Sequence, residues 1–267
     1  MPTIELDHVS KVYKNRRRGW GGSRQSIGVT DVALTIHQGE FVFVVGGSGS
    51  GKSTLLQLIA GQIKPTDGRV YVDQKDLHKM LKLSRNRASV IFGKIWQDPT
   101  LIRKRTVEEN LALASRIALG RESPRLVDVR VKKVLGLVGM KGVEKKYPIE
   151  LSIGECRRVE LARAMIGSPP ILILDEITAN LDDDSIWDTL HLLNDLNRKG
   201  TTIIMATHDS QYVNILRRRV ITMGGGRVQG DVENGKYGDV VGKEQLPHQQ
   251  NRFDIKTINS KNSRRRF

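Results

Sequence analysis

Residues 46–54 form a glycine-rich segment with the spacing of a phosphate-binding loop. Four residues separate Gly46 from Gly51-Lys52-Ser53, as in the motif G-x-x-x-x-G-K-[ST]. The apolar run 41–45 before the segment predicts a buried strand, and residues 54–60 predict a helix directly after it. A glycine turn with a surface lysine is the simpler interpretation, but it leaves the strand–loop–helix order unexplained.

This segment is suited to binding a polyphosphate together with Mg²⁺. Glycines let backbone N–H groups turn toward phosphates, and the start of the following helix adds partial positive charge. Lys52 can reach the β- and γ-phosphates, and the Ser53 hydroxyl can ligate the ion. The residues expected to contact the nucleotide here are Gly46, Gly47, Ser48, Gly49, Ser50, Gly51, Lys52, Ser53 and Thr54.

Two adjacent acids end a second apolar run. Residues 171–174 are apolar and lead into Asp175 and Glu176. A carboxylate at a strand end can hold Mg²⁺, and its neighbour can accept a proton from an attacking water. Solvated acids that merely stop a strand are the alternative, which the presence of a phosphate loop makes weaker.

Three further side chains are candidates whose type alone is not diagnostic. Gln97 follows an expected strand and could ligate Mg²⁺ or orient water, or it could be an ordinary loop residue. His208 also ends an expected strand and could contact a γ-phosphate, or serve only as hydrogen-bonded structure. Tyr13 could stack on an adenine ring or simply pack.

Residues 152–155 read Ser-Ile-Gly-Glu, which is the S-x-x-E pattern of a capping box at a helix N-terminus. The same geometry also suits an anion, because the Ser152 hydroxyl and the Gly154 amide lie at the positive end of the helix. The residues alone leave both interpretations open.

Strands alternating with helices predict an α/β fold with a mainly parallel sheet. Parallel strands are expected at 41–45, 89–92, 171–174, 202–206 and 220–223, and strands at 3–9, 32–36 and 69–72 should form an antiparallel sheet beside the phosphate loop. Residues 106–166 are mainly helical, and a capping box is expected from Thr106 to Glu109. Ligands of such sheets bind at the carboxyl ends of the strands, so one site can collect the loop, the acid pair and His208.

Length and composition set wider limits. The chain has 267 residues, one cysteine (Cys156) and a formal net charge of +15. No intrachain disulfide can form, which fits a reducing compartment, and without a signal peptide or long apolar run the chain is expected to be soluble by itself. Six bases and no acid lie in residues 11–24, and seven bases face two acids in residues 241–267, a tail interpreted as disordered. This charge is compatible with nucleic acid, an acidic membrane surface or plain solubility.

Taken in order, these motifs resemble those of ABC-type ATPase subunits. The segments that carry the resemblance are 46–53, Gln97, 151–155, Asp175-Glu176, 179–182 and His208. The resemblance covers about residues 2–238. It implies a phosphate-loop NTPase fold of ABC type: a mainly parallel sheet flanked by helices, an antiparallel β subdomain and a helical subdomain. The nucleotide-binding domain would span residues 1–240, with the helical part inserted at about 98–166 and the tail 241–267 outside it.

The resemblance also implies roles for the site residues, with ATP and Mg²⁺ as ligands. Two copies would meet head to tail, so that Ser152 and Gly154 of one copy face the γ-phosphate held by Lys52 of the other. Asp182 would lie near the opposing site. The remaining implied roles are a general base at Glu176, a catalytic contact at His208, Mg²⁺ ligands at Ser53, Gln97 and Asp175, coupling at Gln97 and an adenine platform at Tyr13.

Within the family, the sequence is most similar to the FtsE type, which works in cell division with a membrane protein of the FtsX type. This similarity implies a cytoplasmic subunit at the inner face of the cell membrane, where the basic tail could contact anionic lipid. The apolar residues Pro99, Leu101 and Ile102 are the expected docking surface, with helix–helix core as the alternative. Lipoprotein-release and macrolide-export ATPases are the neighbouring alternatives.

Two alternatives of other classes follow from particular features. The charge of +15 would suit a soluble ABC-type ATPase acting on nucleic acid, but the chain lacks the second nucleotide module or long coiled-coil insertion usual in that class. The chain departs from the family pattern at three places, and the first two leave room for a scaffold that binds ATP without hydrolysing it. Ile153 stands where glycine is usual, Ile177 where proline is usual, and Cys156-Arg157 where two glutamines are usual.

Overall fold

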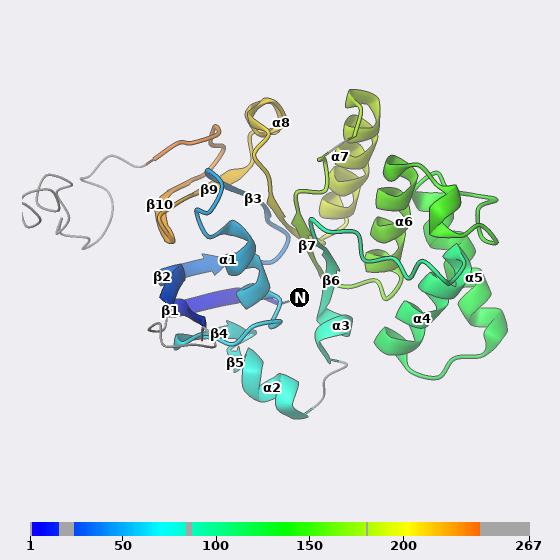
Figure 1. Ribbon diagram of the computed structural model, residues 1–267, viewed down its shortest axis with the longest axis horizontal. Helices are drawn as coiled ribbons and strands as arrows, with labels where there is room; N and C mark the ends of the chain where they lie inside the picture. Colours follow the sequence, from blue (N-terminus) through cyan, green and yellow to red (C-terminus); the bar gives the residue numbers. More distant parts are fainter. Residues whose placement is uncertain (1, 16–23, 84–86, 180, 241–267) are drawn as a thin grey trace, which may run out of the picture.

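Two β-sheets, with one helix between them, hold the glycine loop in place (Figure 1). The computed structural model describes residues 2–15, 24–83, 87–179 and 181–240. The larger sheet has the strand order β10-β9-β3-β8-β7-β6. Its strands are β3 (Phe41–Val45), β6 (Phe92–Ile95), β7 (Ile171–Asp175), β8 (Thr202–Ala206), β9 (Arg219–Gly224) and β10 (Arg227–Val232).

All neighbours in this sheet are parallel except β9 and β10. Every residue of β3, β7 and β8 is buried, as expected of parallel strands covered by helices on both faces. The loop after β3, the acids at the end of β7 and the segment after β8 therefore emerge at the same edge. The predicted α/β fold with a mainly parallel sheet is confirmed.

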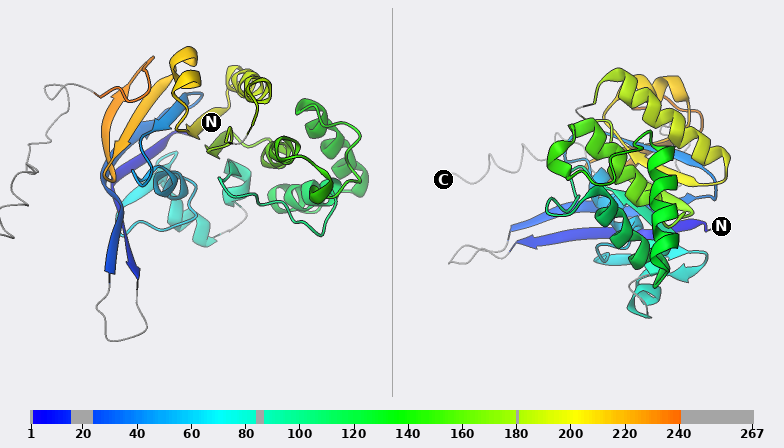
Figure 2. Two further views of the ribbon diagram at one scale, coloured as in Figure 1. Left: turned by 45° about the horizontal axis from the view of Figure 1, so that its top comes forward. Right: turned by 90° about the vertical axis from the view of Figure 1, so that its right-hand side faces the viewer.

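The smaller sheet is antiparallel, as predicted, with the order β2-β1-β4-β5. Its strands are β1 (Ile4–Asn15), β2 (Arg24–Ile36), β4 (Asp67–Val72) and β5 (Lys75–Asp76). The first two strands are longer than predicted, because polar residues beyond Val9 continue to pair in a ribbon that projects from the molecule (Figure 2). Register shifts after Leu6 and Val9 interrupt the apolar alternation that the prediction relied on.

Eight α-helices and one 3₁₀-helix are present in the described residues. They are α1 (Lys52–Ile59), α2 (Leu77–Leu83), α3 (Arg87–Ile91), α4 (Val107–Leu119), α5 (Pro124–Leu137), η1 (Pro148–Glu150), α6 (Ile153–Met165), α7 (Asp183–Arg198) and α8 (Ser210–Leu216). Helix α1 packs in the core between the two sheets, whereas α4, α5, α6, α7 and α8 contribute to a second core on the other face of the large sheet.

One predicted strand is wrong in its position. Residues 89–92 were expected to be extended, but α3 runs to Ile91 and the strand begins at Phe92. The pairing of Phe92 with Ile171 and of Ile95 with Leu174 fixes this register. Val90 is 44% exposed, so the apolar run that suggested a buried strand is not buried throughout.

The predicted helix starts are confirmed at two caps. Thr106 and Glu109 form the reciprocal bonds of a capping box at α4, and Ser152 and Glu155 do so at α6. Four short elements, β5, α2, α8 and β10, were not predicted. Among the helices of the described residues, none combines the length and apolarity needed to cross a bilayer.

Candidate functional site

The glycine loop adopts backbone angles that only glycine accepts without strain at two positions. Gly46 has φ 141° and Gly51 has φ 107°. A Cβ atom at Gly46 would lie 2.2 Å from the Met223 carbonyl oxygen, and one at Gly51 would lie 2.5 Å from that of Gly28. The backbone of the loop therefore packs closely against β9 on one side and β2 on the other. The first helical hydrogen bond, from Leu55 N–H to the Gly51 carbonyl, is 2.9 Å long.

Lys52 is the first residue of α1, and its side chain folds back over the loop. The residue is only 9% exposed, and its Nζ donates to the carbonyls of Gly46 at 2.8 Å and Gly47 at 3.3 Å. The buried Ser50 hydroxyl has no hydrogen-bond partner among the described residues. A buried ammonium held only by carbonyls, beside a free hydroxyl and the N-terminus of α1, fits a phosphate group.

Asp175 provides a buried carboxylate next to the loop. It is 3% exposed, it lies beside the Ser53 side chain, and its Oδ1 has no partner in the described part of the chain. Burial raises the pKa of Asp175, and the nearby Glu176 carboxylate raises it further. An orphaned carboxylate oxygen beside a serine hydroxyl fits a hard divalent cation such as Mg²⁺.

Such an ion would need ligands from outside the protein as well. The described residues hold no cluster of three or more His, Cys, Asp or Glu side chains with metal-binding geometry. Mg²⁺ commonly takes one or two protein ligands and fills the other positions with phosphate oxygens and water. Ser53 and Asp175 match that pattern, so this site suits a metal ion that arrives with a nucleotide.

Glu176 and His208 meet above the end of β7. Glu176 has a positive φ of 52°, and its backbone N–H donates to the Ala206 carbonyl at 3.0 Å. Its Oε2 lies 2.7 Å from His208 Nδ1. The Glu176 side chain is 10% exposed and that of His208 is 69% exposed. Glu176 is therefore nearly buried at the edge of the sheet, whereas His208 is open to solvent. The next residue, Ile177, is 2% exposed and belongs to the core, which explains why an apolar residue is accepted there.

Tyr13 stands beside the first turn of α1. Its hydroxyl is 3.4 Å from Thr54 Oγ1, and Lys11 Nζ lies 5.5 Å from the ring centroid. A Cβ atom at Gly28 would lie 2.8 Å from the tyrosine ring, so the glycine makes room for it. The ring is 37% exposed and remains available for stacking at the rim of the loop.

Ser152 and Asp182 form a second group. Ser152 caps α6, accepting from Glu155 N–H at 3.2 Å, and Asp182 caps α7, accepting from Ser185 N–H at 2.8 Å. A Cβ atom at Gly154 would lie 3.5 Å from a Leu181 methyl group, so the two helix starts are neighbours. Ile153 is 62% exposed, which leaves the start of α6 open to solvent.

The structure thus divides the predicted site residues between two surfaces. Lys52, Ser53, Asp175 and Glu176 gather with His208 around α1 and the ends of the parallel strands. Helices α1 and α6 belong to cores on opposite faces of the large sheet (Figure 1). The Ser152 group is therefore separated from the phosphate loop within one chain.

Gln97 joins neither group through its side chain. It is exposed, and no side-chain hydrogen bond of Gln97 is present in the described residues, but its backbone carbonyl accepts from Arg157 on α6. Arg157 also donates to the Trp96 carbonyl at 3.0 Å and to Glu160 at 2.8 Å. These contacts fix the chain around Gln97 to the helix that begins at Ser152.

Glu160 extends this connection and was missed from the sequence. It is 1% exposed and accepts from Thr100 N–H at 2.6 Å and from Thr100 Oγ1 at 3.1 Å. Arg163 completes the cluster, donating to the Thr100 carbonyl at 2.7 Å. The signal was available, because Arg157 and Glu160 are oppositely charged residues at an i, i+3 spacing in a segment expected to be helical.

Tyr212 is a second residue that sequence reasoning missed. Its hydroxyl donates to Asp183 Oδ1 at 2.9 Å, and its ring packs edge-on against Trp187. Tyr212 lies on α8, just after His208, whereas Asp183 directly follows Asp182. This contact joins the two segments that carry His208 and Asp182.

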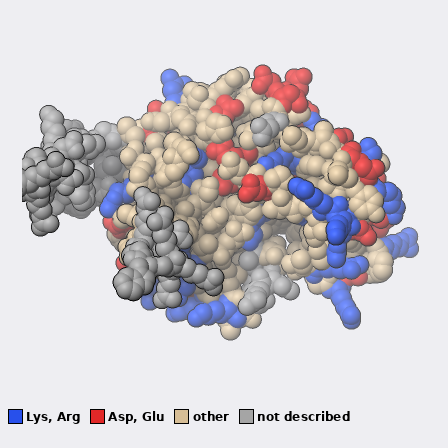
Figure 3. Space-filling view, viewed as in Figure 1, with Lys and Arg blue, Asp and Glu red and all other residues tan. Residues whose placement is uncertain are grey.

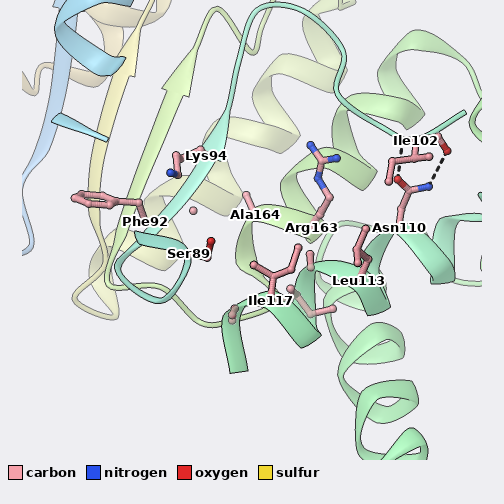
Figure 4. Close-up of a pocket in the computed structure, with 14 residues that line it drawn as sticks. Ser89, Phe92, Lys94, Ile102, Asn110, Leu113, Ile117, Arg163 and Ala164 are labelled. Carbon is pink, nitrogen blue, oxygen red and sulfur yellow. Dashed lines mark hydrogen bonds between the residues drawn. The ribbon is translucent and has the colours of Figure 1, made fainter. Parts of the chain in front are cut away.

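A cavity of about 260 Å³ lies apart from the phosphate loop, between β6, α4 and α6 (Figure 4). We call it the α4 groove; its lining residues are Ser89, Phe92, Gly93, Lys94, Ile102, Asn110, Leu113, Ala114, Ile117, Ala118, Arg163, Ala164, Ile166 and Gly167. Ile102 is 40% exposed at this groove, but Leu101 packs against the core. In the predicted docking segment, Ile102 thus lines the groove, whereas Leu101 packs against the hydrophobic core.

Comparison with known proteins gives consistent matches over most of the chain. The sequence is similar to the cell division ATP-binding protein FtsE of Bacillus subtilis (strain 168), at 39% identity over 88% of this chain and 98% of that protein. The FtsE of Mycobacterium tuberculosis is 38% identical over 88% and 98% of the two chains. The methionine import protein MetN of Vibrio cholerae is 36% identical over 92% of this chain and 69% of its own length.

Among solved structures, the fold is similar to the ATP-binding cassette MJ0796, determined as a dimer in a post-hydrolysis state bound to ADP and Pi. The TM-score is 0.78 at 30% identity, with 88% of this chain and 100% of that chain covered. The family model described as ABC transporter matches residues 29–179. Because that match spans more than half of the chain, and the FtsE relatives are matched over nearly their full length, the chain belongs to the ABC transporter family as an ATPase subunit.

Proposed function

We propose that this protein binds Mg²⁺-ATP between two copies of itself and uses its hydrolysis to drive or gate an integral membrane protein of the FtsX type. The observation that carries the proposal is the acid pair at the end of β7: Asp175 beside Ser53, and Glu176 beside His208. In the proposed roles, a metal ligand and a proton acceptor would stand next to the glycine loop. The nucleotide-binding domain would comprise residues 1–240, with its helical part at about 98–166.

In this proposal, each group performs one task. Lys52 holds the β- and γ-phosphates once its amine leaves the loop carbonyls, and Tyr13 stacks on the adenine. Ser53 and Asp175 would hold Mg²⁺, with Gln97 as a further ligand once its side chain reaches the ion, and the ion would neutralise charge on the transferring phosphoryl group. Glu176 accepts the proton of the attacking water, and His208 orients Glu176 and contacts the γ-phosphate.

The dimer completes the site. Ser152 and Gly154 are exposed or half-buried at the start of α6 and lie away from the phosphate loop of their own chain. A second copy placed head to tail would bring them, with Asp182, to the γ-phosphate held by Lys52. The MJ0796 cassette, which resembles this chain at a TM-score of 0.78, was itself determined as a dimer.

A role in cell division and cell-wall remodelling is supported by the extent of the similarities. The FtsE proteins of Bacillus subtilis and Streptococcus pneumoniae are covered over 98% and 99% of their lengths, whereas the MetN protein is covered over 69%. The protein would then act from the cytoplasmic side of the membrane, with the α4 groove as its docking surface. ATPases of lipoprotein release or macrolide export, and a soluble ATPase acting on nucleic acid, are the alternatives.

Substitution of Glu176 tests the central claim. We expect Glu176→Gln to keep ATP binding but to hydrolyse ATP about 10²–10⁴ times more slowly, because the positioned base is lost. With ATP, this variant should sediment as a dimer, whereas the nucleotide-free parent should be mostly monomeric. Lys52→Ala is the matched control and should lose ATP binding and dimer together.

Three outcomes would contradict the proposal. Hydrolysis at the parent rate by Glu176→Gln would exclude Glu176 as the general base. A monomer in saturating ATP at micromolar protein would exclude the shared site. An absence of Mg²⁺-dependent hydrolysis by the parent chain, with binding intact, would favour a scaffold that holds ATP without turnover.

A further inference from the structure

Another cavity, of about 300 Å³, is bounded by α5, the end of α6 and the end of α7, and we call it the α5–α7 cavity. Its lining residues do not include those of the candidate site. One wall is a single face of α5, on which residues three or four positions apart line up: Arg130, Lys133, Val134 and Leu137. The other wall is formed by the end of α7 and the turn after it: Leu196, Lys199 and Thr201.

The floor of the α5–α7 cavity is apolar. Met165, Ile166 and Leu172 line it and are buried. All three belong to the core that covers this face of the large sheet, so the floor is continuous with that core. Small-molecule sites are typically cavities of this kind, apolar inside with a few polar groups, and about 300 Å³ is the lower end of their range. The floor therefore suits an aliphatic group.

The mouth of the cavity is basic. Its lining contains the cations of Arg130, Lys133 and Lys199 and no acidic residue. Arg130 is paired with Glu122 at 3.0 Å. The side chains of Lys133 and Lys199 are exposed and have no hydrogen-bond or ion-pair partner among the residues that the structure describes. Because these two lysines come from different walls, an anion at the mouth would meet an ammonium group on each side.

Two hydroxyl groups and the surrounding charge favour the same kind of ligand. Ser168 and Thr201 also line the cavity, and neither hydroxyl makes a hydrogen bond within the described part of the chain. Lys and Arg side chains are gathered over the end of the molecule that holds α4 and α5 (Figure 3), and such a field raises the local concentration of anions. The cavity thus combines unpaired donors, positive charge and an apolar floor.

We propose that the α5–α7 cavity is a binding site for a single-chain aliphatic anion, with the chain on the apolar floor and the headgroup between Lys133 and Lys199. The headgroup is a carboxylate or a phosphate monoester, since an ammonium group pairs with either as a point charge. This site is separate from the nucleotide and does not depend on the proposed function. The chain's own tail does not fit, because seven bases and two acids in residues 241–267 give it the same sign of charge as the mouth.

Titration calorimetry on the nucleotide-free full chain measures the headgroup preference. Octanoate and octyl phosphate should each bind as a single equivalent. Octanol has the same chain without the charge and should bind about tenfold more weakly, because two exposed ion pairs are lost; octylammonium should not bind. Hexanoate should bind about 15-fold more weakly than octanoate, because two fewer methylenes are buried. The tighter of octanoate and octyl phosphate identifies the source as a fatty acid or a phosphorylated alcohol.

A methionine methyl signal locates the bound ligand. Of the six methionines in the chain, Met165 lines the cavity. In NMR spectra of protein with isotope-labelled methionine methyl groups, octanoate should shift the Met165 signal more than the other methionine signals. The variant Met165→Leu identifies which signal belongs to this residue.

Two variants separate the headgroup from the chain. Lys133→Gln with Lys199→Gln should weaken octanoate binding about tenfold and leave octanol binding unchanged. The matched control, Lys79→Gln with Lys236→Gln, removes the same charge at exposed positions outside the cavity and should bind octanoate as the parent does. Leu137→Trp should fill the cavity and abolish binding of both ligands. Because Leu137 is 43% exposed, this substitution should leave the fold intact, which its melting temperature checks.

The proposal would be overturned if neither octanoate nor octyl phosphate bound at millimolar concentration. Equal affinities for octanol and octanoate, or undiminished octanoate binding by the variant that lacks Lys133 and Lys199, would also overturn it by removing the anionic headgroup. An unmoved Met165 signal would place bound octanoate elsewhere. Binding of many equivalents that survives Leu137→Trp would reflect unspecific attraction to a chain of net charge +15. ATP hydrolysis and dimerisation are judged separately, by Glu176→Gln.

Discussion

Asp175 and Glu176 are neighbours in sequence but have different surroundings. Asp175 ends β7 under the phosphate loop, with one oxygen unpaired, whereas Glu176 turns outward through a positive φ to meet His208. Burial favours the protonated form of Asp175, and a bound divalent cation would favour the ionised form. The nucleotide-free protein therefore holds a carboxylate whose charge costs stability until an ion arrives.

Asp175→Asn should stabilise the nucleotide-free protein at neutral pH. Because the pKa of Asp175 is raised in the folded state above its ordinary value of 3.8, ionisation costs stability above the folded pKa, and this cost disappears as the pH falls through it. The variant's melting temperature should exceed the parent's at neutral pH, and the difference should shrink toward about pH 4.

With Mg²⁺-ATP the order of stability should reverse, because the parent should gain more from the nucleotide than Asp175→Asn does. The parent should gain about 2.7 kcal/mol from Mg²⁺-ATP at a hundredfold excess over Kd, whereas Asp175→Asn should gain much less. Thermal melts with ATP and EDTA serve as the control, since they remove the metal but not the nucleotide. A nucleotide-free variant that melts below the parent at neutral pH would contradict the view that desolvation dominates at Asp175.

Helix α6 connects two segments of the proposed site through a buried ionic cluster. It begins with Ser152 and Gly154, and one to two turns later Arg157 and Glu160 hold the backbone from Trp96 to Thr100. Gln97 lies in that segment, so movement of its chain should carry the start of α6 with it. The usual glutamine at position 157 would carry no charge, and the arginine here is matched by Glu160.

Removing one member of this pair should cost more than removing both. Glu160→Ala leaves the Arg157 guanidinium, 9% exposed, without its counter-charge, and should lower the free energy of unfolding by about 3–5 kcal/mol. Arg157→Gln combined with Glu160→Ala removes both charges and should recover much of that loss. Urea unfolding at constant pH measures all three proteins.

An exposed pair on the same helix provides the control. Arg158 meets Asp188 at 3.3 Å with the aspartate side chain 71% exposed, so Asp188→Ala should cost about 0–1 kcal/mol. Equal losses for Asp188→Ala and Glu160→Ala would show that burial does not set the strength of the Arg157–Glu160 contact. Strict additivity in the double variant would show that the two residues do not interact.

The whole molecule combines a large central sheet, covered on both faces, with a strongly basic surface. The two cores hold the nucleotide elements on one face and the helices α4 to α7 on the other. Much of the net charge of +15 lies outside the described residues, notably in 241–267. The predicted disorder of that tail therefore remains a prediction, and its contact with lipid a proposal.

Truncation tests the role proposed for the tail. Seven bases and two acids give residues 241–267 a net charge of +5, which at ~1 kcal/mol per residue near anionic lipid allows at most ~5 kcal/mol. That corresponds to an affinity of only ~0.1–1 mM, so the tail should assist docking and not replace it. The full chain should bind anionic vesicles in a salt-sensitive way, and a chain ending at Val240 should bind them less.

Neutral vesicles and DNA complete this comparison. Equal binding of both chains to anionic vesicles would make the tail a solvated extension. DNA binding should be lost at physiological ionic strength, because residues 241–267 contain only Phe253 and Phe267 as aromatic residues that could stack on bases. Salt-resistant binding to DNA would instead support the nucleic-acid alternative.

Local sequence determined the features that depend on contacts within a few residues. The phosphate loop needs only its glycines, Lys52 and the adjoining strand and helix. The caps at Thr106 and Ser152 are closed by residues three positions away, and both were predicted correctly. The acids after β7 were predictable because an apolar run that ends in charge marks the carboxyl end of a buried parallel strand.

Tertiary structure decided what depends on distant partners. Strand β6 begins at Phe92 because it pairs with β7, and β1 continues past Val9 because β2 pairs with it. The bond from Arg157 to the Gln97 carbonyl, the α4 groove and the separation of Ser152 from Lys52 all join segments far apart in the chain. A single sequence gives the types of these residues, but only the packing of helices on the two faces of the sheet brings them together or keeps them apart.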